Sequence, residues 1–230
     1  MMINHPKLME MVQSACRDNA ARQIEIYLRK EAMLSLVSGE KAILDVGCGR
    51  GVTSVYLAAM GHMVTGMDCS ESEMDYGRKM AQRYSIKVNF KTGRIEEIEF
   101  PDESYDIIIC EETLEHLENP LGALKKFRRI LRQNGRILIS VPNTGSIRAR
   151  LLNCVGMKER LYCPDHKQNF TAPSIRELLN SAGFKNIFVT SDFLAVPKLP
   201  LGFFIEKRKY LAKLMPSLGH HIVAYGEKNG

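Results

Sequence analysis

The amino-acid sequence predicts an α/β fold in which helices cover both faces of a mostly parallel β-sheet. From Lys41 onward, short apolar segments of strand length alternate with longer segments whose apolar residues recur at helical spacing. The runs Ile107–Cys110 and Ile137–Val141 are apolar at consecutive positions, as expected of strands buried on both faces. Such alternation of strand and helix is typical of a doubly wound sheet.

Each expected element has recognisable ends. Gly61 ends the first helix after the glycine-rich turn, Ser70 and Glu73 have the spacing of a capping box, and Pro173 begins a later helix. The helix before the fifth strand is expected to stop at Asn134–Gly135. Seven strands are expected, at Ala42–Val46, Met63–Met67, Ile86–Phe90, Tyr105–Cys110, Arg136–Val141, Ile187–Phe193 and His221–Gly226.

The expected organisation is a helical segment over residues 1–39 followed by one domain over residues 40–230. Helical periodicity in residues 5–37 supports the first, and a chain of 230 residues can bury a substantial core in a single domain. Two stretches, near residues 144–170 and 195–219, break the alternation, and we expect them to be insertions over the active cleft.

Composition and charge are those of an ordinary soluble protein, with 45% hydrophobic and 25% charged residues. No apolar run approaches the roughly 18 residues that cross a bilayer, and the first residues lack a secretory pattern, so we expect a cytoplasmic protein. The six cysteines show no zinc-ligand spacing, so no metal ligand is assigned. The net charge of +6 includes basic clusters that we interpret mainly as solvated helix faces.

The strongest functional motif is a glycine-rich turn between the first strand and the next helix. Residues Ile43–Gly51 read ILDVGCGRG, with glycine at positions 47, 49 and 51. Glycine lets the backbone turn sharply and approach a ligand closely. Free N–H groups at the start of the following helix favour a negative ligand group. The motif therefore predicts a nucleotide-type cofactor site.

Two aspartates indicate which cofactor this is. Asp68 ends the second strand, 19 residues beyond Gly49, where a carboxylate can accept from both ribose hydroxyls. The alternative role is a cap for the next helix, for which Ser70 is better placed. A nicotinamide fingerprint needs glycine or alanine where this chain has Val52. Asp45, just before the turn, instead suits a cationic ammonium group, which S-adenosylmethionine has.

On these residues the chain resembles the class I S-adenosylmethionine-dependent methyltransferases, closest to the small-molecule group that includes the ubiquinone-biosynthesis O-methyltransferases. The resemblance implies a Rossmann-like seven-stranded sheet with an antiparallel last strand, S-adenosyl-L-methionine as cofactor and S-adenosyl-L-homocysteine as product. It assigns Asp45, Gly47, Gly49 and Gly51 to the methionine end and Asp68 to the ribose. The segments that carry it, in order over about residues 40–195, are LDVGCGRG, VTGMD, SYDIIICEETLEHLENP, LKKFRRILRQNGRILISVPN and HKQNFTAPSIRELLNSAGF.

Four further positions are expected to contact the cofactor. Cys48 and Cys69 follow the first and second strands, and Glu111 directly follows the fourth. Relatives often have an aspartate after the third strand that accepts from the adenine amino group, but here Arg94 can only donate. The backbone N–H of Ile95 is then the expected donor to an adenine ring nitrogen.

The candidate catalytic residues are Glu112, His116 and His166. Glu112 and His116 follow the fourth strand and are four residues apart, so they share a face if the segment is helical. His166 lies in a loop that approaches the acceptor in the resembling family. A hydroxyl acceptor would benefit from such a general base. The alternative, in which both histidines are structural and Glu112 or Glu115 caps a helix, stays open.

We expect the methyl acceptor to be a small molecule. Nucleic-acid bases are disfavoured, because the turn at Glu111–Leu114 lacks the Asn/Asp-Pro-Pro-aromatic pattern and no Pro-Cys dipeptide is present. Residues 199–215 join an apolar run to a basic cluster, which suggests a lipophilic acceptor and peripheral membrane contact, or else a lid. A macromolecular acceptor and a regulatory protein that binds the cofactor without transfer remain alternatives, and the oligomeric state is not predicted.

Overall fold

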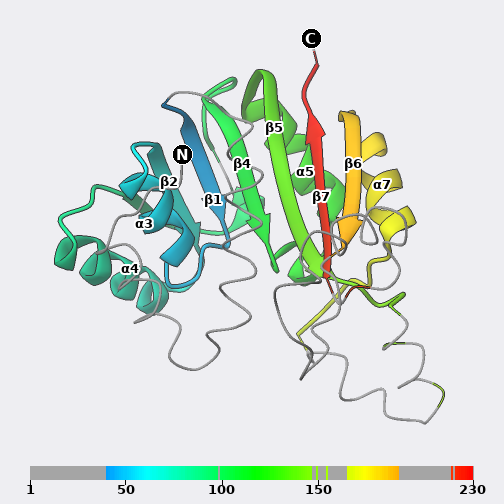
Figure 1. Ribbon diagram of the computed structural model, residues 1–230, viewed down its shortest axis with the longest axis horizontal. Helices are drawn as coiled ribbons and strands as arrows, with labels where there is room; N and C mark the ends of the chain where they lie inside the picture. Colours follow the sequence, from blue (N-terminus) through cyan, green and yellow to red (C-terminus); the bar gives the residue numbers. More distant parts are fainter. Residues whose placement is uncertain are drawn as a thin grey trace, which may run out of the picture. The chain divides into compact units, whose positions relative to one another are not determined.

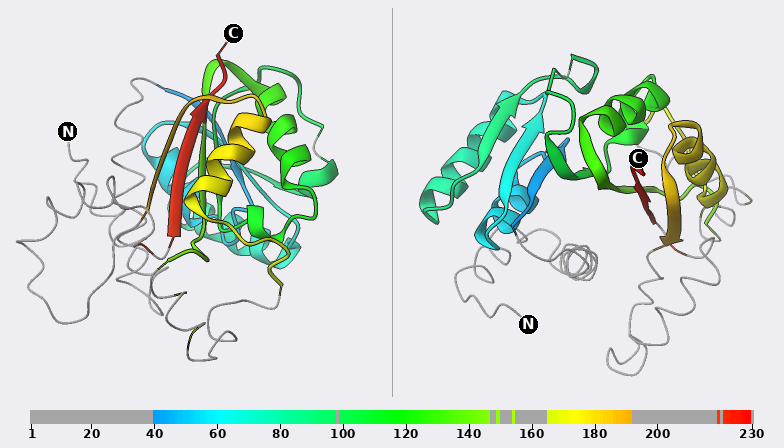
Figure 2. Two further views of the ribbon diagram at one scale, coloured as in Figure 1. Left: turned by 90° about the vertical axis from the view of Figure 1, so that its right-hand side faces the viewer. Right: turned by 90° about the horizontal axis from the view of Figure 1, so that it is seen from above.

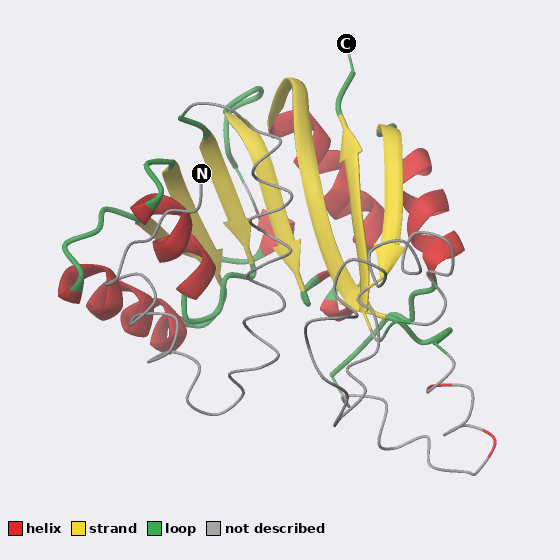
Figure 3. Ribbon diagram, viewed as in Figure 1, coloured by secondary structure: helices red, strands yellow, loops and turns green. Residues whose placement is uncertain are grey.

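The computed structural model describes residues 40–97, 99–146, 149, 154, 165–191, 219 and 221–229 (Figure 3). The helices expected over residues 5–37 lie outside the described residues. So does the expected insertion at 195–219 except for Gly219, while the one at 144–170 is described mainly at its two ends. The chain forms two compact units, Met1–Arg94 and Ile95–Gly230, which are taken in turn.

The first unit contains three parallel strands in the order β3-β2-β1 (Figure 1). Helix α3 packs on β2 and on α4, and α4 packs on β2 and β3. The elements are β1 (Ala42–Val46), α3 (Val52–Ala59), β2 (Met63–Asp68), α4 (Glu71–Arg83) and β3 (Asn89–Thr92).

Strand β3 begins later than the sequence predicts, at Asn89 instead of Ile86. The backbone N–H of Ile86 donates to the carbonyl of Ala81, 2.9 Å away, so Ile86 closes the C-terminus of α4. Ser85 has a φ of 56°, the left-handed conformation that commonly ends a helix. The apolar Ile86 therefore covers the helix end and is not part of the strand.

In the second unit, the strand order is β4-β5-β7-β6, with β4 parallel to β5 and β7 antiparallel to both neighbours. Helices α5 and α7 pack on each other and on one face of β5, β7 and β6 (Figure 2). The elements are η1 (Ile95–Glu97), β4 (Tyr105–Glu111), η2 (Leu114–His116), α5 (Pro120–Ile130), β5 (Leu131–Pro142), α7 (Ala172–Ser181), β6 (Lys185–Ser191) and β7 (His221–Glu227). The predicted seven-stranded α/β sheet with an antiparallel last strand is confirmed.

Helix α5 ends at Ile130, before the predicted stop at Asn134–Gly135. Leu131 already has extended backbone angles and pairs with Tyr105 in the sheet. Asn134 adopts a left-handed φ of 61°, and its N–H donates to the carbonyl of Lys228 at 2.7 Å. The Asn134–Gly135 turn signal thus marks an irregularity inside β5 and not the end of the helix.

The ring of Phe90 occupies the space left by three glycines of the first unit. A Cβ atom would lie 2.6 Å from this ring at Gly51, 2.9 Å at Gly66 and 2.8 Å at Gly77. Real Cβ atoms do not approach so closely, so each of the three positions requires glycine while the ring stays in place. The glycine turn, β2 and α4 are packed against one another in this way.

We expect Gly66→Ala to lower the free energy of unfolding by about 1–3 kcal/mol, because the added methyl group overlaps the Phe90 ring and the Ser54 hydroxyl. Gly93→Ala is the matched control, since its Cβ would meet only the flexible end of Met67. Urea unfolding monitored by circular dichroism measures both variants. Equal stability of the two would show that Phe90 moves aside without loss.

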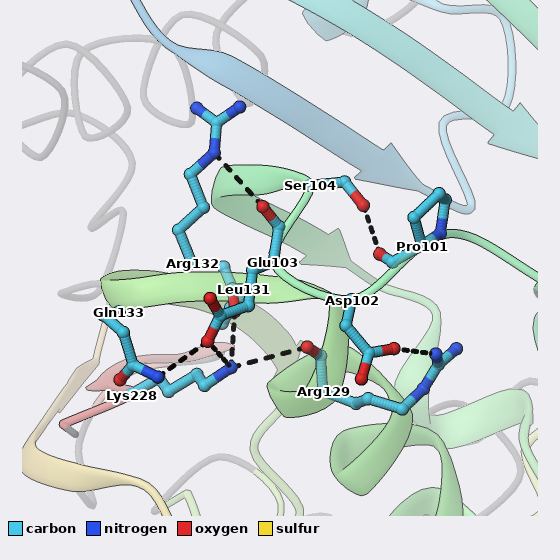
Figure 4. A network of polar contacts seen from close by, with 9 residues as sticks. All are labelled: Pro101, Asp102, Glu103, Ser104, Arg129, Leu131, Arg132, Gln133 and Lys228. Carbon is cyan, nitrogen blue, oxygen red and sulfur yellow. Dashed lines mark hydrogen bonds and ion pairs between the residues drawn. The ribbon is translucent and has the colours of Figure 1, made fainter.

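Lys228, after β7, places its ammonium group against the end of α5 (Figure 4). The Nζ atom donates to the carbonyls of Leu131 at 2.7 Å and Arg129 at 3.4 Å, and it lies 3.3 Å from Glu103 Oε1. Carbonyls at a helix C-terminus lack intrahelical donors and carry partial negative charge. The buried ammonium therefore caps α5 and ties the last strand to it.

Lys228→Met should lower the free energy of unfolding by about 1–3 kcal/mol, because the buried Leu131 carbonyl loses its charged donor. The exposed Lys167, which pairs with Glu118, gives the control Lys167→Met, for which we expect a change below about 0.5 kcal/mol. Urea denaturation measures the free energy of unfolding of both variants. A stability loss no larger than that of the control would contradict the capping role.

Candidate active site

The glycine turn of the first unit is built from left-handed residues. Gly47, Gly49 and Gly51 have φ values of 67°, 51° and 67°, which glycine adopts without strain. The amides of Gly47 and Cys48 both donate to the carbonyl of Met67, at 2.7 and 3.0 Å, and the amide of Gly51 donates to Cys48 at 2.9 Å. These bonds fix the turn against the end of β2. Gly51 is the N-cap of α3 and brings no capping side chain to that helix start.

Asp68 connects the turn to α4. Its Oδ2 accepts from the Gly49 amide and its Oδ1 accepts from the Ser70 amide, both at 2.9 Å. The Ser70 hydroxyl caps α4 by accepting from Glu73 N, as the sequence predicts. An ionised carboxylate accepts about four hydrogen bonds, so two amides leave acceptor capacity for ribose hydroxyls. Asp68 supports the turn, and its predicted ribose contact stays a prediction.

Asp45 and Cys48 lie beside the same turn. Asp45 is only 2% exposed, and its Oδ2 accepts from the Ser54 hydroxyl of α3 at 2.6 Å. Burial, and then the negative charges of Asp45 and Asp68, raise the pKa of the Cys48 thiol far above its usual range. Cys48 is therefore a neutral thiol, which suits a packing role beside a ligand and not nucleophilic chemistry. Cys69, by contrast, is exposed.

In the second unit, Glu112 follows β4 in a constrained conformation. Its φ is 46°, a left-handed conformation that is uncommon for a residue with a side chain. Its N–H donates to the Ser140 carbonyl at 2.8 Å, and its Oε1 accepts from the Ser140 hydroxyl at 2.7 Å. Its Oε2 lies 3.5 Å from His221 Nε2. Ser140 and His221 thus orient the Glu112 carboxylate.

Glu115, His116 and His166 form a second group close to Glu112. His166 Nε2 lies 3.9 Å from Glu115 Oε1, and the two imidazole rings meet edge to face with centroids 4.9 Å apart. Glu115 is 1% exposed, and neither of its carboxylate oxygens has a hydrogen-bond partner among the described residues. Burial, and then the charge of Glu112, raise the pKa of Glu115 to about 8.

The segment around His166 is held on η2 by backbone contacts. The amides of Lys167 and Gln168 donate to the Glu115 carbonyl at 2.8 and 3.0 Å, and His116 Nδ1 lies 3.2 Å from the Asp165 carbonyl. These bonds bring His166 to Glu115 and His116 despite about fifty residues of intervening chain. Burial, and then the charge of His116, lower the pKa of His166. His166 is therefore mostly a neutral imidazole at pH 7.

The same three side chains have the atoms and spacing to hold a cation. One ligand atom each from Glu115, His116 and His166 lie within 4.8 Å of one another. Imidazole nitrogen and carboxylate oxygen are common ligands of divalent transition metals. A cation there would also give the buried Glu115 carboxylate a partner. No metal ligand was expected from the sequence, because cysteine spacing does not reveal that these two distant segments meet.

The second unit thus brings together the predicted candidates Glu112, His116 and His166. Glu111 ends β4, and Ile95 is buried at the start of η1, as their places in the sequence imply. Sequence reasoning missed Ser140 and His221. The place of His221 could have been predicted from the strand directions. An antiparallel strand begins at the edge of the sheet where the neighbouring parallel strand ends, and Pro142 at the end of β5 pairs with His221.

Glu115→Gln should make the protein relatively more stable as pH rises. A carboxyl group whose pKa is raised on folding contributes stability at low pH that is lost as pH rises toward the folded-state value of about 8. The glutamine variant lacks this loss, so its stability relative to wild type should rise by about 3 kcal/mol between pH 5.5 and 8.5. Urea unfolding at both pH values provides the test, and a constant difference would contradict the buried, unpaired state of Glu115.

Comparison with known proteins finds one family model and several curated relatives that match part of this chain. Residues 44–139 match the family model described as a methyltransferase domain. Among curated proteins, the chain is 35% identical over 116 residues to the ubiquinone biosynthesis O-methyltransferase of Coxiella burnetii, covering 50% of this chain and 49% of that protein. The Rickettsia conorii protein of the same name is 33% identical over 130 residues, or 55% of this chain and 45% of that protein. The chain spans about half the length of the curated relatives it matches.

Solved structures with the same fold cover nearly the whole chain. A methyltransferase from Archaeoglobus fulgidus, described as SAM-dependent, superposes with a TM-score of 0.66 and 18% identity, covering 96% of this chain and 99% of that one. A SAM-dependent methyltransferase from Thermotoga maritima, described as a possible histamine N-methyltransferase, gives a TM-score of 0.64 and 18% identity, covering 96% and 100%. These structures confirm the Rossmann-like fold that the sequence predicts, and the resemblance to methyltransferases is supported over the matched residues 44–139.

Proposed function

We propose that this chain, whose residues 44–139 form a methyltransferase domain, binds S-adenosyl-L-methionine and transfers its methyl group to a small molecule, leaving S-adenosyl-L-homocysteine. The observation that carries the proposal is the bond from the Gly49 amide to Asp68, which holds a turn of three left-handed glycines beside the buried Asp45. The described neighbours from Archaeoglobus and Thermotoga support the cofactor, since both are named SAM-dependent.

The cofactor-binding residues follow from the chemistry of the turn. Asp45, a buried acid that accepts a hydrogen bond from the Ser54 hydroxyl, is proposed to attract the ammonium group. Asp68 is proposed to accept from the ribose hydroxyls, and the Ile95 N–H to donate to adenine. The remaining proposed contacts are Gly47, Cys48, Gly49, Gly51, Cys69 and Glu111.

The sulfonium of the cofactor supplies an activated methyl group, so the protein has to align the acceptor and remove its proton. His166 suits proton acceptance, because its lowered pKa keeps the imidazole neutral at pH 7. Glu112 and His116 are the alternative bases, and Ser140 and His221 orient Glu112. A hydroxyl acceptor fits these groups and is supported by the O-methyltransferase names of the curated relatives.

A lipophilic acceptor remains part of the proposal on sequence grounds. The apolar and basic segment 199–215, proposed for peripheral membrane contact or for a lid, lies outside the described residues. Within the described part of the chain, no helix has the length and apolar character to cross a membrane. A macromolecular acceptor and a regulatory role without methyl transfer are the alternatives that assays must separate.

Calorimetric titration of S-adenosyl-L-homocysteine tests the cofactor proposal. Wild type should bind at micromolar concentration, and Asp68→Ala should weaken binding at least about tenfold, because a charged acceptor of ribose and of the Gly49 amide is lost. Ser70→Ala is the matched control, since Ser70 caps α4 with its hydroxyl and does not hold the turn. Absence of binding by folded, ligand-free wild type would contradict the proposal.

Methyl transfer is measured separately from binding. The assay measures formation of S-adenosyl-L-homocysteine in the presence of a panel of phenols and lipid-like hydroxyl compounds. With His166 as the base, His166→Ala should abolish this activity or reduce it at least about a hundredfold. Binding of the cofactor with no transfer to any class of acceptor would instead favour the regulatory alternative.

A further inference from the structure

Arg50 lies in the middle of the glycine turn, and its side chain extends away from the turn onto α4. Its Nε atom is 3.3 Å from Glu73 Oε2, and its guanidinium carbon is 5.2 Å from the centroid of the Tyr76 ring. The first contact is an ion pair and the second has the geometry of a cation–π interaction. The two contacts join the turn to the helix through side chains alone.

The part of α4 that receives Arg50 is a continuous face. Glu73, Tyr76 and Gly77 are spaced i, i+3 and i+4, so they are neighbours on the helix surface. A Cβ atom at Gly77 would lie 3.3 Å from the Arg50 carbonyl oxygen, and one at Gly51 would lie 3.5 Å from Gly77 Cα. The backbone of the turn therefore packs against α4 at Gly77, which has no side chain to keep it away. The Arg50 side chain contacts the same face of the helix.

The turn is also held from its other side. The Gly49 amide donates to Asp68, and the second oxygen of Asp68 accepts from Ser70 at the start of α4. Positions 49 and 50 are thus fixed by two independent contacts to the β2–α4 segment. External restraint is needed here, because left-handed glycines have more conformational freedom than other residues and lose more entropy when ordered.

We propose that Arg50, Glu73 and Tyr76 are positioning residues that clamp the glycine turn in its cofactor-binding conformation before the cofactor arrives. The inference rests on the proposed function, since it assigns the clamp's effect to cofactor affinity. A binding loop that is ordered in advance loses less entropy on binding, so the clamp increases affinity without touching the ligand. The ion pair is largely exposed, with side-chain exposures of 59% for Arg50 and 36% for Glu73, so salt weakens it.

Arg50→Met tests the clamp, because methionine keeps an unbranched apolar stem and removes the guanidinium. Two exposed contacts of this kind correspond to roughly a three- to tenfold loss of affinity, measured by calorimetric titration. The loss should be equal for S-adenosyl-L-methionine and S-adenosyl-L-homocysteine, since a positioning residue does not distinguish the sulfonium. Arg50→Lys, which keeps the charge near Glu73 without the planar group, should recover part of the affinity.

The matched control is Arg78→Met. Arg78 lies on the same helix and pairs with Glu71 and Asp75, with a side-chain exposure of 40%, but it does not contact the turn. Its removal should leave affinity within about twofold of wild type. An affinity for Arg50→Met equal to that of this control would overturn the clamp. A loss that differs between the two ligands would also overturn it, because Arg50 would then contact the cofactor itself.

A second measurement does not depend on the cofactor. In the free protein, hydrogen exchange at the amides of Gly49 and Gly51 reports the order of the turn, since they donate to Asp68 and Cys48. Arg50→Met should accelerate exchange there by about three- to tenfold, and Arg78→Met should not. Unchanged exchange in Arg50→Met would overturn the proposal. If wild type binds neither ligand, the proposed function fails, while this measurement still decides whether the clamp exists.

Discussion

The carboxylate of Asp68 accepts hydrogen bonds from two backbone amides, and the arrangement of the first unit depends on this pair of bonds. One bond fixes Gly49 in the turn after β1, and the other fixes Ser70 at the start of α4. Because a charge-assisted hydrogen bond is stronger than a neutral one, a single ionised side chain can hold two loops at the ends of neighbouring strands. The carboxylate thereby joins the glycine turn to the start of α4 through its two oxygens.

Close packing of Phe90 also supports the glycine turn. Its ring fills the space next to three glycines, which come from the turn, from β2 and from α4. Since each of these positions lacks a side chain, backbones approach more closely than other residues would allow. The turn is therefore held by a hydrogen-bonded aspartate, by an aromatic ring and by the Arg50 side chain. Such redundancy is expected where a glycine-rich segment must keep one conformation.

The second unit places its polar side chains differently, through strand direction. Glu112 follows a parallel strand, Ser140 lies near the end of the next one, and His221 begins the antiparallel strand beside it. These three positions meet because parallel strands end, and the antiparallel strand begins, at one edge of the four-stranded part. Glu115 and His166 then meet through backbone bonds between η2 and Lys167–Gln168. The result is a group of two acids and three histidines close together. Within it, burial and the charge of Glu112 raise the pKa of Glu115.

The sequence by itself determined most of the fold, because strands and helices leave local periodicities of apolar residues. Every strand begins within five residues of its predicted start, and only β3, which begins at Asn89 instead of Ile86, is shifted off most of its predicted range. The glycine turn with Asp45 and Asp68 was also readable, since its residues lie near each other along the chain and have a distinctive order. The two errors have different causes. Ile86 closes helix α4 through a local bond to Ala81, and Asn134 is used by a tertiary contact, because its N–H donates to the distant Lys228 carbonyl.

Only the tertiary structure decided which distant side chains face one another. Neither Ser140 nor His221 carries a local mark of its contact with Glu112, and the burial of Glu115 without a hydrogen-bond partner depends on the segment that folds over it. Likewise, the sequence does not show that Arg50 reaches Glu73 and Tyr76, because that contact requires the backbone to approach at Gly77. Local patterns determine elements, since they reflect one chain segment and its solvent. Burial, charge and pKa are set by neighbours that the fold supplies from elsewhere.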